Sequence, residues 1–141
     1  MPCPFFEPQA VVLHPQHAGA RLPLFDEYEG TCHASTEPVA VPSDLRFRFC
    51  NHGYSRGECA AFPLSAGNGC ARFDLLHTTP DSLEILYVEE RDHAPVRWQS
   101  LRFLPQTESL EPDPDDGCLR AQALAFCRGY LRHFRKIYNK I

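Results

Sequence analysis

Several features that would place this sequence in a familiar class are missing from its 141 residues. No apolar run approaches the roughly 18 residues that a membrane-spanning helix needs, and the first residues lack the pattern of a signal peptide. None of the seven cysteines belongs to a CxxC pair, and their odd number argues against a fully paired disulfide framework. The sequence therefore predicts a cytoplasmic protein whose cysteines are ligands, redox centres or buried small side chains.

Acidic residues are absent from the C-terminal part of the chain, and lysine is absent from the rest. All eighteen acidic residues precede Gly117 together with eight arginines, whereas six basic residues and no acidic one follow it. The basic segment could contact an acidic partner, nucleic acid, or the acidic linker of its own chain, or it could be an ordinary solvated face. Because few aromatic residues interleave with the basic ones, we expect a protein partner rather than nucleic acid.

Proline is abundant, with thirteen residues, and it restricts where helices can form. Residues 1–44 are predicted to be an irregular, proline-rich N-terminal arm. Alternation of apolar and polar residues predicts strands over residues 45–50, 71–77, 82–88 and 96–104. The acidic residues 105–117 are interrupted by proline and are predicted to be a linker.

Residues 118–138 have a helical pattern, and Asp115 or Asp116 could cap the helix. Apolar residues recur there at steps of three or four, at Leu119, Ala123, Phe126, Tyr130, Phe134 and Ile137. Strands followed by a helix, without alternation of the two, predict an α+β fold over a single domain of residues 1–141. We expect an antiparallel sheet of about four strands with one long basic C-terminal helix packed on it.

The most distinctive stretch is the loop of residues 50–70, which holds three cysteines and four of the eight glycines. Glycine lets the backbone approach a bound group closely, and thiolates are the preferred ligands of zinc and iron–sulfur clusters. The candidate metal ligands are therefore Cys50, Cys59 and Cys70, with Cys32 or Cys118 as the fourth.

Two other residues of this loop are candidates for contact with the cofactor. Arg56 could place a positive charge beside it, and Tyr54 could shield it from water. The eight and ten residues that separate the loop cysteines are longer intervals than zinc ribbons use. Buried or free thiols are therefore an alternative interpretation of the same residues.

The two cysteines of the predicted helix are expected to have different roles. They are nine residues apart and point to opposite sides of a helix, since each residue turns the chain by about 100°. Cys127 lies at the margin of the apolar face and is assigned to the core. Cys118 lies at the helix N-terminus, where the helix dipole favours a thiolate.

Taken together, these patterns predict a small protein that binds a metal ion or an iron–sulfur cluster. Zinc would give a structural site, and a cluster would give an electron carrier or a redox sensor. The alternative is a metal-free interaction module that docks through the basic helix or the proline-rich arm. An enzyme that uses a cysteine or the acidic hairpin near residues 89–92 ranks third.

Overall fold

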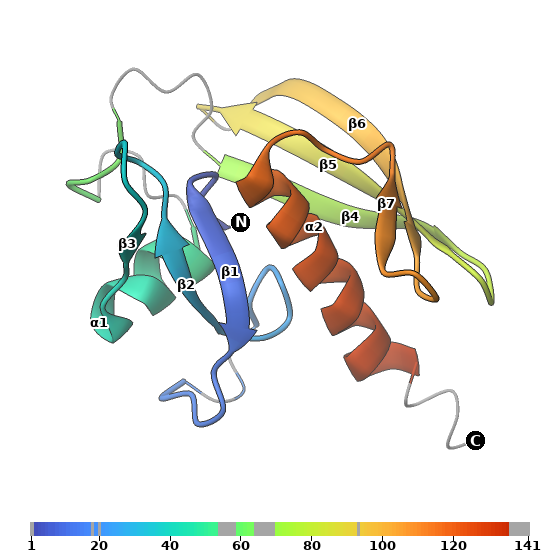
Figure 1. The fold of residues 1–141 in the computed structure, drawn as a ribbon, viewed down its shortest axis with the longest axis horizontal. Helices are drawn as coiled ribbons and strands as arrows, with labels where there is room; N and C mark the ends of the chain where they lie inside the picture. Colours follow the sequence, from blue (N-terminus) through green and yellow to red (C-terminus); the bar gives the residue numbers. More distant parts are fainter. Residues whose placement is uncertain are drawn as a thin grey trace.

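The computed structural model describes residues 2–17, 19, 21–53, 59–63, 70–92 and 94–135, with Cys70 and Arg135 described by their backbone alone. The fold is α+β, with two antiparallel sheets and a C-terminal helix, α2 (Gly117–Tyr130), that contacts strands of both (Figure 1). A single core of buried side chains extends from the first sheet through the helix to the second.

The second sheet is the predicted antiparallel meander. It contains β4 (Cys70–Thr78), β5 (Leu83–Arg91), β6 (Ala94–Leu104) and β7 (Ser109–Glu111), in that order. Alternate residues of β5, among them Leu83, Ile85 and Tyr87, are buried, as period-two alternation predicts. The fourth strand, β7, comes from the segment that was predicted to be a linker.

Residues 45–50, predicted to be a strand, are helical instead. The short helix α1 (Ser43–Leu45) continues into a π-helical segment, η1 (Arg46–Asn51). The Asn51 amide accepts a hydrogen bond from the Tyr28 N–H at 2.8 Å and donates one to the Tyr28 carbonyl at 2.9 Å. A side chain thus takes the backbone groups that a neighbouring strand would pair with, and the prediction of a strand was wrong.

The N-terminal 44 residues are more regular than the sequence suggests. They contain β1 (Phe6–Val11), β2 (Tyr28–Cys32) and β3 (Val39–Ala40), which form a three-stranded sheet in that order. Pro8 is tolerated because β1 is an edge strand and its register shifts between Pro8 and Ala10. The prolines therefore shorten and bend these strands without abolishing them.

Helix α2 begins where the sequence predicts. The Asp116 carboxylate accepts hydrogen bonds from the N–H groups of Cys118 and Leu119, at 2.9 and 3.1 Å, which satisfies two of the unpaired donors of the first turn. Of the predicted apolar face, the helix buries Ala123 and Phe126, whereas Leu119 and Tyr130 are partly buried, Phe134 is exposed and Ile137 lies outside the described residues. The helix continues into a π-helical turn, η2 (Leu131–Arg135).

A cluster around Asp26 fastens this C-terminal end to the loop before β2. The Asp26 carboxylate accepts hydrogen bonds from Arg132 at 2.6 Å and from His133 at 2.9 Å, and Arg132 also donates to the Tyr28 hydroxyl at 2.9 Å. Partial burial acts to raise the pKa of Asp26, but the hydrogen bonds from Arg132 and His133 outweigh it and hold the pKa below its ordinary value.

Replacement of Gly30 by alanine should separate β1 from β2. A Cβ atom at Gly30 would lie 1.9 Å from the Glu7 carbonyl oxygen, so the strands could not keep their present distance. We expect Gly30→Ala to lower the free energy of unfolding by roughly 3 kcal/mol in urea titrations. Gly117→Ala is the matched control, because a Cβ there meets nothing within 4 Å; an equal loss in both variants would contradict the explanation.

The Asp26 cluster should make stability depend on pH in the acid range. Because the folded pKa of Asp26 lies below its ordinary value of 3.8, its contribution is complete above that value and is lost as the pH falls through the folded pKa. Asp26→Asn should cost about 1 kcal/mol near neutral pH, after allowance for solvent screening, and progressively less on acidification. Urea titrations of both proteins over the acid range measure this. If the difference in the free energy of unfolding between wild type and Asp26→Asn stays constant with pH, Asp26 does not have this role.

Candidate functional site

Cys3, which sequence reasoning did not select, is held directly against Cys50. Residues 3–6 form a tight turn in which the Phe6 N–H donates to the Cys3 carbonyl at 3.0 Å, with Pro4 at the position that favours proline. The Cys3 N–H donates in turn to the Cys50 carbonyl, also at 3.0 Å. Both side chains are buried. The turn before β1 therefore brings an N-terminal thiol to the segment that carries a predicted ligand.

Cys50 is fixed by the polar network around η1. Asn51, the next residue, is buried, and its amide also donates to the Arg46 carbonyl at 3.1 Å. The Arg46 guanidinium forms a salt bridge of 3.0 Å with the buried carboxylate of Glu27. These bonds hold η1 against β2 and leave little freedom to the backbone at Cys50.

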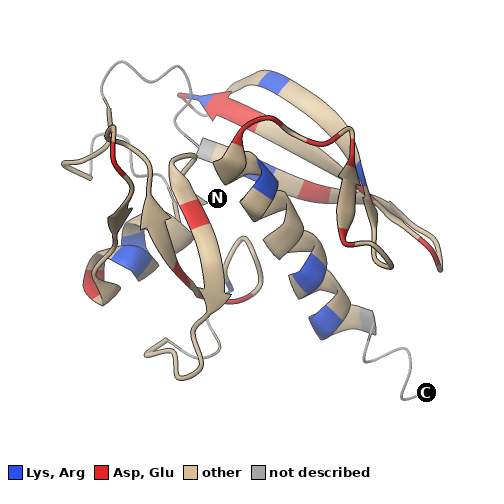
Figure 2. Cartoon of the chain, viewed as in Figure 1, with Lys and Arg blue, Asp and Glu red and all other residues tan. Residues whose placement is uncertain are grey.

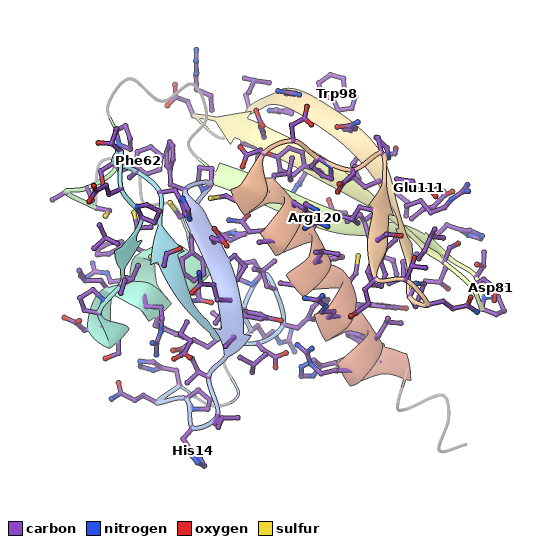
Figure 3. All side chains as sticks on the ribbon, viewed as in Figure 1. His14, Phe62, Asp81, Trp98, Glu111 and Arg120 are labelled. Carbon is purple, nitrogen blue, oxygen red and sulfur yellow. The ribbon has the colours of Figure 1, made fainter. Side chains whose placement is uncertain are left out.

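Cys32 and Cys59 come to the same region from two other segments. Cys32 lies opposite Phe6 in the β1–β2 ladder. The Cys59 carbonyl accepts a hydrogen bond from the Phe62 N–H at 3.1 Å, and the Phe62 ring packs edge-on against Phe5, with 5.3 Å between the centroids. Figure 3 shows sulfur atoms gathered between Phe62 and the first turn of α2.

The pKa of Cys50 depends on three other thiols as well as on burial. Burial is the largest cause, and together with the thiols of Cys3, Cys32 and Cys59 it raises the pKa of Cys50 to about 12, while Arg46 opposes the increase. We refer to Cys3, Cys32, Cys50 and Cys59 as the thiol cluster. In contrast, burial alone raises the pKa of Cys127, with Arg128 opposing, and its side chain is fully buried in the core, as predicted.

Cys118 adjoins the thiol cluster from the first turn of α2. It lines a pocket of about 370 Å³ together with Glu7, His33 and Asp116, and His33 forms a 2.7 Å ion pair with Glu7. Burial raises the pKa of Cys118 to about 12, and Asp116, Glu7, Cys3 and Cys32 contribute to the increase. Burial and the carboxylates of Asp116 and Glu7 oppose ionisation of the thiol, and the expectation that the helix N-terminus favours a Cys118 thiolate stays a prediction.

Three of the five predicted ligands, Cys32, Cys50 and Cys59, thus meet in the thiol cluster, and Cys118 lies next to it. The backbone of Cys70 pairs with Glu90 at the start of β4, but its side chain lies outside the described residues, as do Tyr54 and Arg56. A signal for Cys3 was present in the sequence, since a Cys-Pro turn precedes β1. It was passed over because the arm was expected to be irregular.

No three Cys, His, Asp or Glu side chains in the described part of the chain form a group that could hold a metal ion as they stand. To ligate one, the thiols of the cluster would have to rotate toward a common centre. Among the described helices, none has the length and apolar character needed to cross a membrane.

The basic face of α2 is largely occupied by carboxylates of its own chain. Arg120 pairs with Asp113 and Arg128 with Glu108, each at 2.8 Å, and Arg132 pairs with Asp26. Figure 2 shows the basic residues along the helix and acidic residues on the segment that precedes it. Arg120 and Arg128 thus contact acidic residues of the segment 105–117. This is one of the interpretations that the uneven charge of the sequence left open.

Comparison with known proteins gives no further indication of function: no family model, no curated protein and no solved structure matches the chain.

Removal of the Asn51 amide should loosen the segment that carries Cys50. Asn51→Ala leaves the Tyr28 N–H and the Tyr28 and Arg46 carbonyls without this partner, and we expect a loss of about 3 kcal/mol in the free energy of unfolding in urea titrations. Gln9→Ala is the control, because its amide makes one exposed 3.4 Å bond to Thr31. Gln9→Ala should change stability by less than about 0.5 kcal/mol, and a similarly small loss for Asn51→Ala would refute the role of the network.

Proposed function

We propose that this protein binds an iron–sulfur cluster or a zinc ion through the thiol cluster of Cys3, Cys32, Cys50 and Cys59. The observation that carries the proposal is the convergence of four thiols from four separate segments at one end of the first sheet. A set of four thiolates suits zinc and iron–sulfur clusters. A core that needed only small apolar side chains would have no reason to gather its thiols, and Cys127 shows how such a thiol is placed.

The protonation of these thiols bears on how a metal would bind. The neighbouring thiols raise the pKa of Cys50 because several thiolates cannot be close together in a buried place without a positive charge between them. A metal centre supplies that charge and displaces the protons. Binding is therefore expected to release protons and to weaken as the pH falls.

Of the two, an iron–sulfur cluster is the first candidate, because it demands less of the distance between the sulfurs than a single zinc ion does. Zinc binds each thiolate at about 2.3 Å and draws four sulfurs close around one atom. A cluster has several irons and sulfides at its centre and keeps its thiolates farther apart. An electron carrier or redox sensor is the corresponding role.

The alternative, a metal-free interaction module, has less support. Among the side chains that the structure describes, the arginines of α2 and η2 are engaged by Asp113, Glu108 and Asp26. In the arm, residues 6–11, 28–32 and 39–40 are paired as strands and are not free, extended peptide. Docking through either segment would have to replace these contacts.

Metal content after anaerobic purification tests the proposal. We expect brown protein that contains iron and inorganic sulfide. Cys3→Ser should lose most of the bound metal, since it removes one ligand and leaves the other thiols in place. Cys127→Ser is the matched control, because it also changes a buried cysteine but one outside the thiol cluster, and it should keep its metal.

The other outcomes are equally informative. If the protein is colourless and contains stoichiometric zinc that Cys3→Ser loses, the proposed ligands are correct and the metal is zinc. Full metal content in Cys3→Ser would remove Cys3 from the ligand set. Wild-type protein that stays folded and metal-free, and that takes up neither zinc nor a reconstituted cluster, would exclude metal binding and leave the interaction module.

A further inference from the structure

We infer that Gln122 of helix α2 is the positioning residue that holds Cys3 in the thiol cluster. The inference rests on the proposed function and names a residue outside the ligand set. Gln122 is 1% exposed, and its amide nitrogen donates to two carbonyls of the N-terminal turn, those of Cys3 at 2.7 Å and Phe6 at 2.8 Å. Both bonds cross more than one hundred residues of sequence.

The chemistry of the contact fixes the orientation of this amide. Both neighbours are carbonyl oxygens, which can only accept, so the NH₂ group must face them. Rotation of the amide by a half-turn would place its own oxygen against two others. In the observed orientation the Gln122 oxygen is buried without a partner, which has a cost. Both hydrogen bonds donated by the amide go to the turn that carries Cys3, and the amide oxygen is left without a partner.

The turn is fastened on two sides as a result. The Cys3 N–H is bonded to the Cys50 carbonyl in η1, and the Cys3 carbonyl is bonded to Gln122 and to the Phe6 N–H. Without Gln122, the carbonyls of Cys3 and Phe6 would lose these two bonds to α2. Hydrogen bonds of this kind, one step away from the metal, commonly contribute 10-fold to 100-fold to affinity.

Replacement of Gln122 by methionine removes the amide and keeps the length and helix propensity of the side chain. For full-length protein, we expect Gln122→Met to weaken zinc binding about 10-fold or more in competition with a chromophoric chelator. In metal-free protein, iodoacetamide should label Cys3 several-fold faster than in the wild type, as measured by mass spectrometry. Gln122→Glu keeps the size and removes the donors at neutral pH, and it should act in the same direction if the methionine variant does not fold.

Two controls separate local positioning from general instability. Cys127 lies on the same helix and is fully buried, so its labelling reports opening of the core in the same molecule. Arg132→Gln loosens the other end of the helix, at Asp26 and Tyr28, and should change neither the zinc affinity nor the labelling of Cys3.

Labelling of Cys3 at the wild-type rate in Gln122→Met would overturn the inference, and so would equal acceleration of Cys3 and Cys127. The proposed function fails in a different way. If the wild-type chain binds neither zinc nor a cluster, Cys3 is not a ligand, although faster labelling of Cys3 in Gln122→Met would still show that Gln122 holds the turn.

Discussion

The peptide group of Cys3 is the point at which the separate parts of this fold are joined. Its N–H binds η1 and its carbonyl binds α2, while the residues that follow it enter the first sheet as β1. Because η1 is in turn attached to β2 through Asn51, one short turn connects three segments that are far apart in the sequence. This junction places Cys3 against the segment that carries Cys50.

The thiol cluster and Cys127 show two different solutions for burying cysteine. Cys127 is surrounded by apolar side chains, and its neutral thiol behaves as a small hydrophobic group. Cys50 has three thiols as neighbours, and that arrangement adds nothing to an apolar core that alanine or valine would not provide. In the proposed function these thiols serve as soft ligands, and a bound cation would relieve the repulsion between them once they are ionised.

The predictions from sequence were accurate where structure depends on local pattern and failed where it depends on distant partners. The meander from β4 to β6 and the helix α2 follow from their own periodicity, and the Asp116 cap from its position. Residues 45–50 alternate like a strand, yet Asn51 binds the backbone of Tyr28 and makes the segment helical. In the same way, Cys3 enters the site through bonds to Cys50 and Gln122 that no local pattern contains, whereas Cys50 and Cys59 were found from their glycine-rich surroundings.

The uneven distribution of charge also acts within the molecule, and it bears on the same site. Arg120 and Arg128 hold the acidic segment around Glu108 and Asp113 against α2, and this segment leads directly to the Asp116 cap. The cap fixes the first turn of α2, which carries Cys118 beside the thiol cluster and Gln122 one turn later. Asp116 thus caps the helix that carries Gln122 to Cys3, and the exposed ion pairs of Arg120 and Arg128 make a smaller contribution. The acidic segment and the cysteines are separate features of the sequence. In the structure they are connected, because the helix that Asp116 caps also carries Gln122, which binds the turn of Cys3.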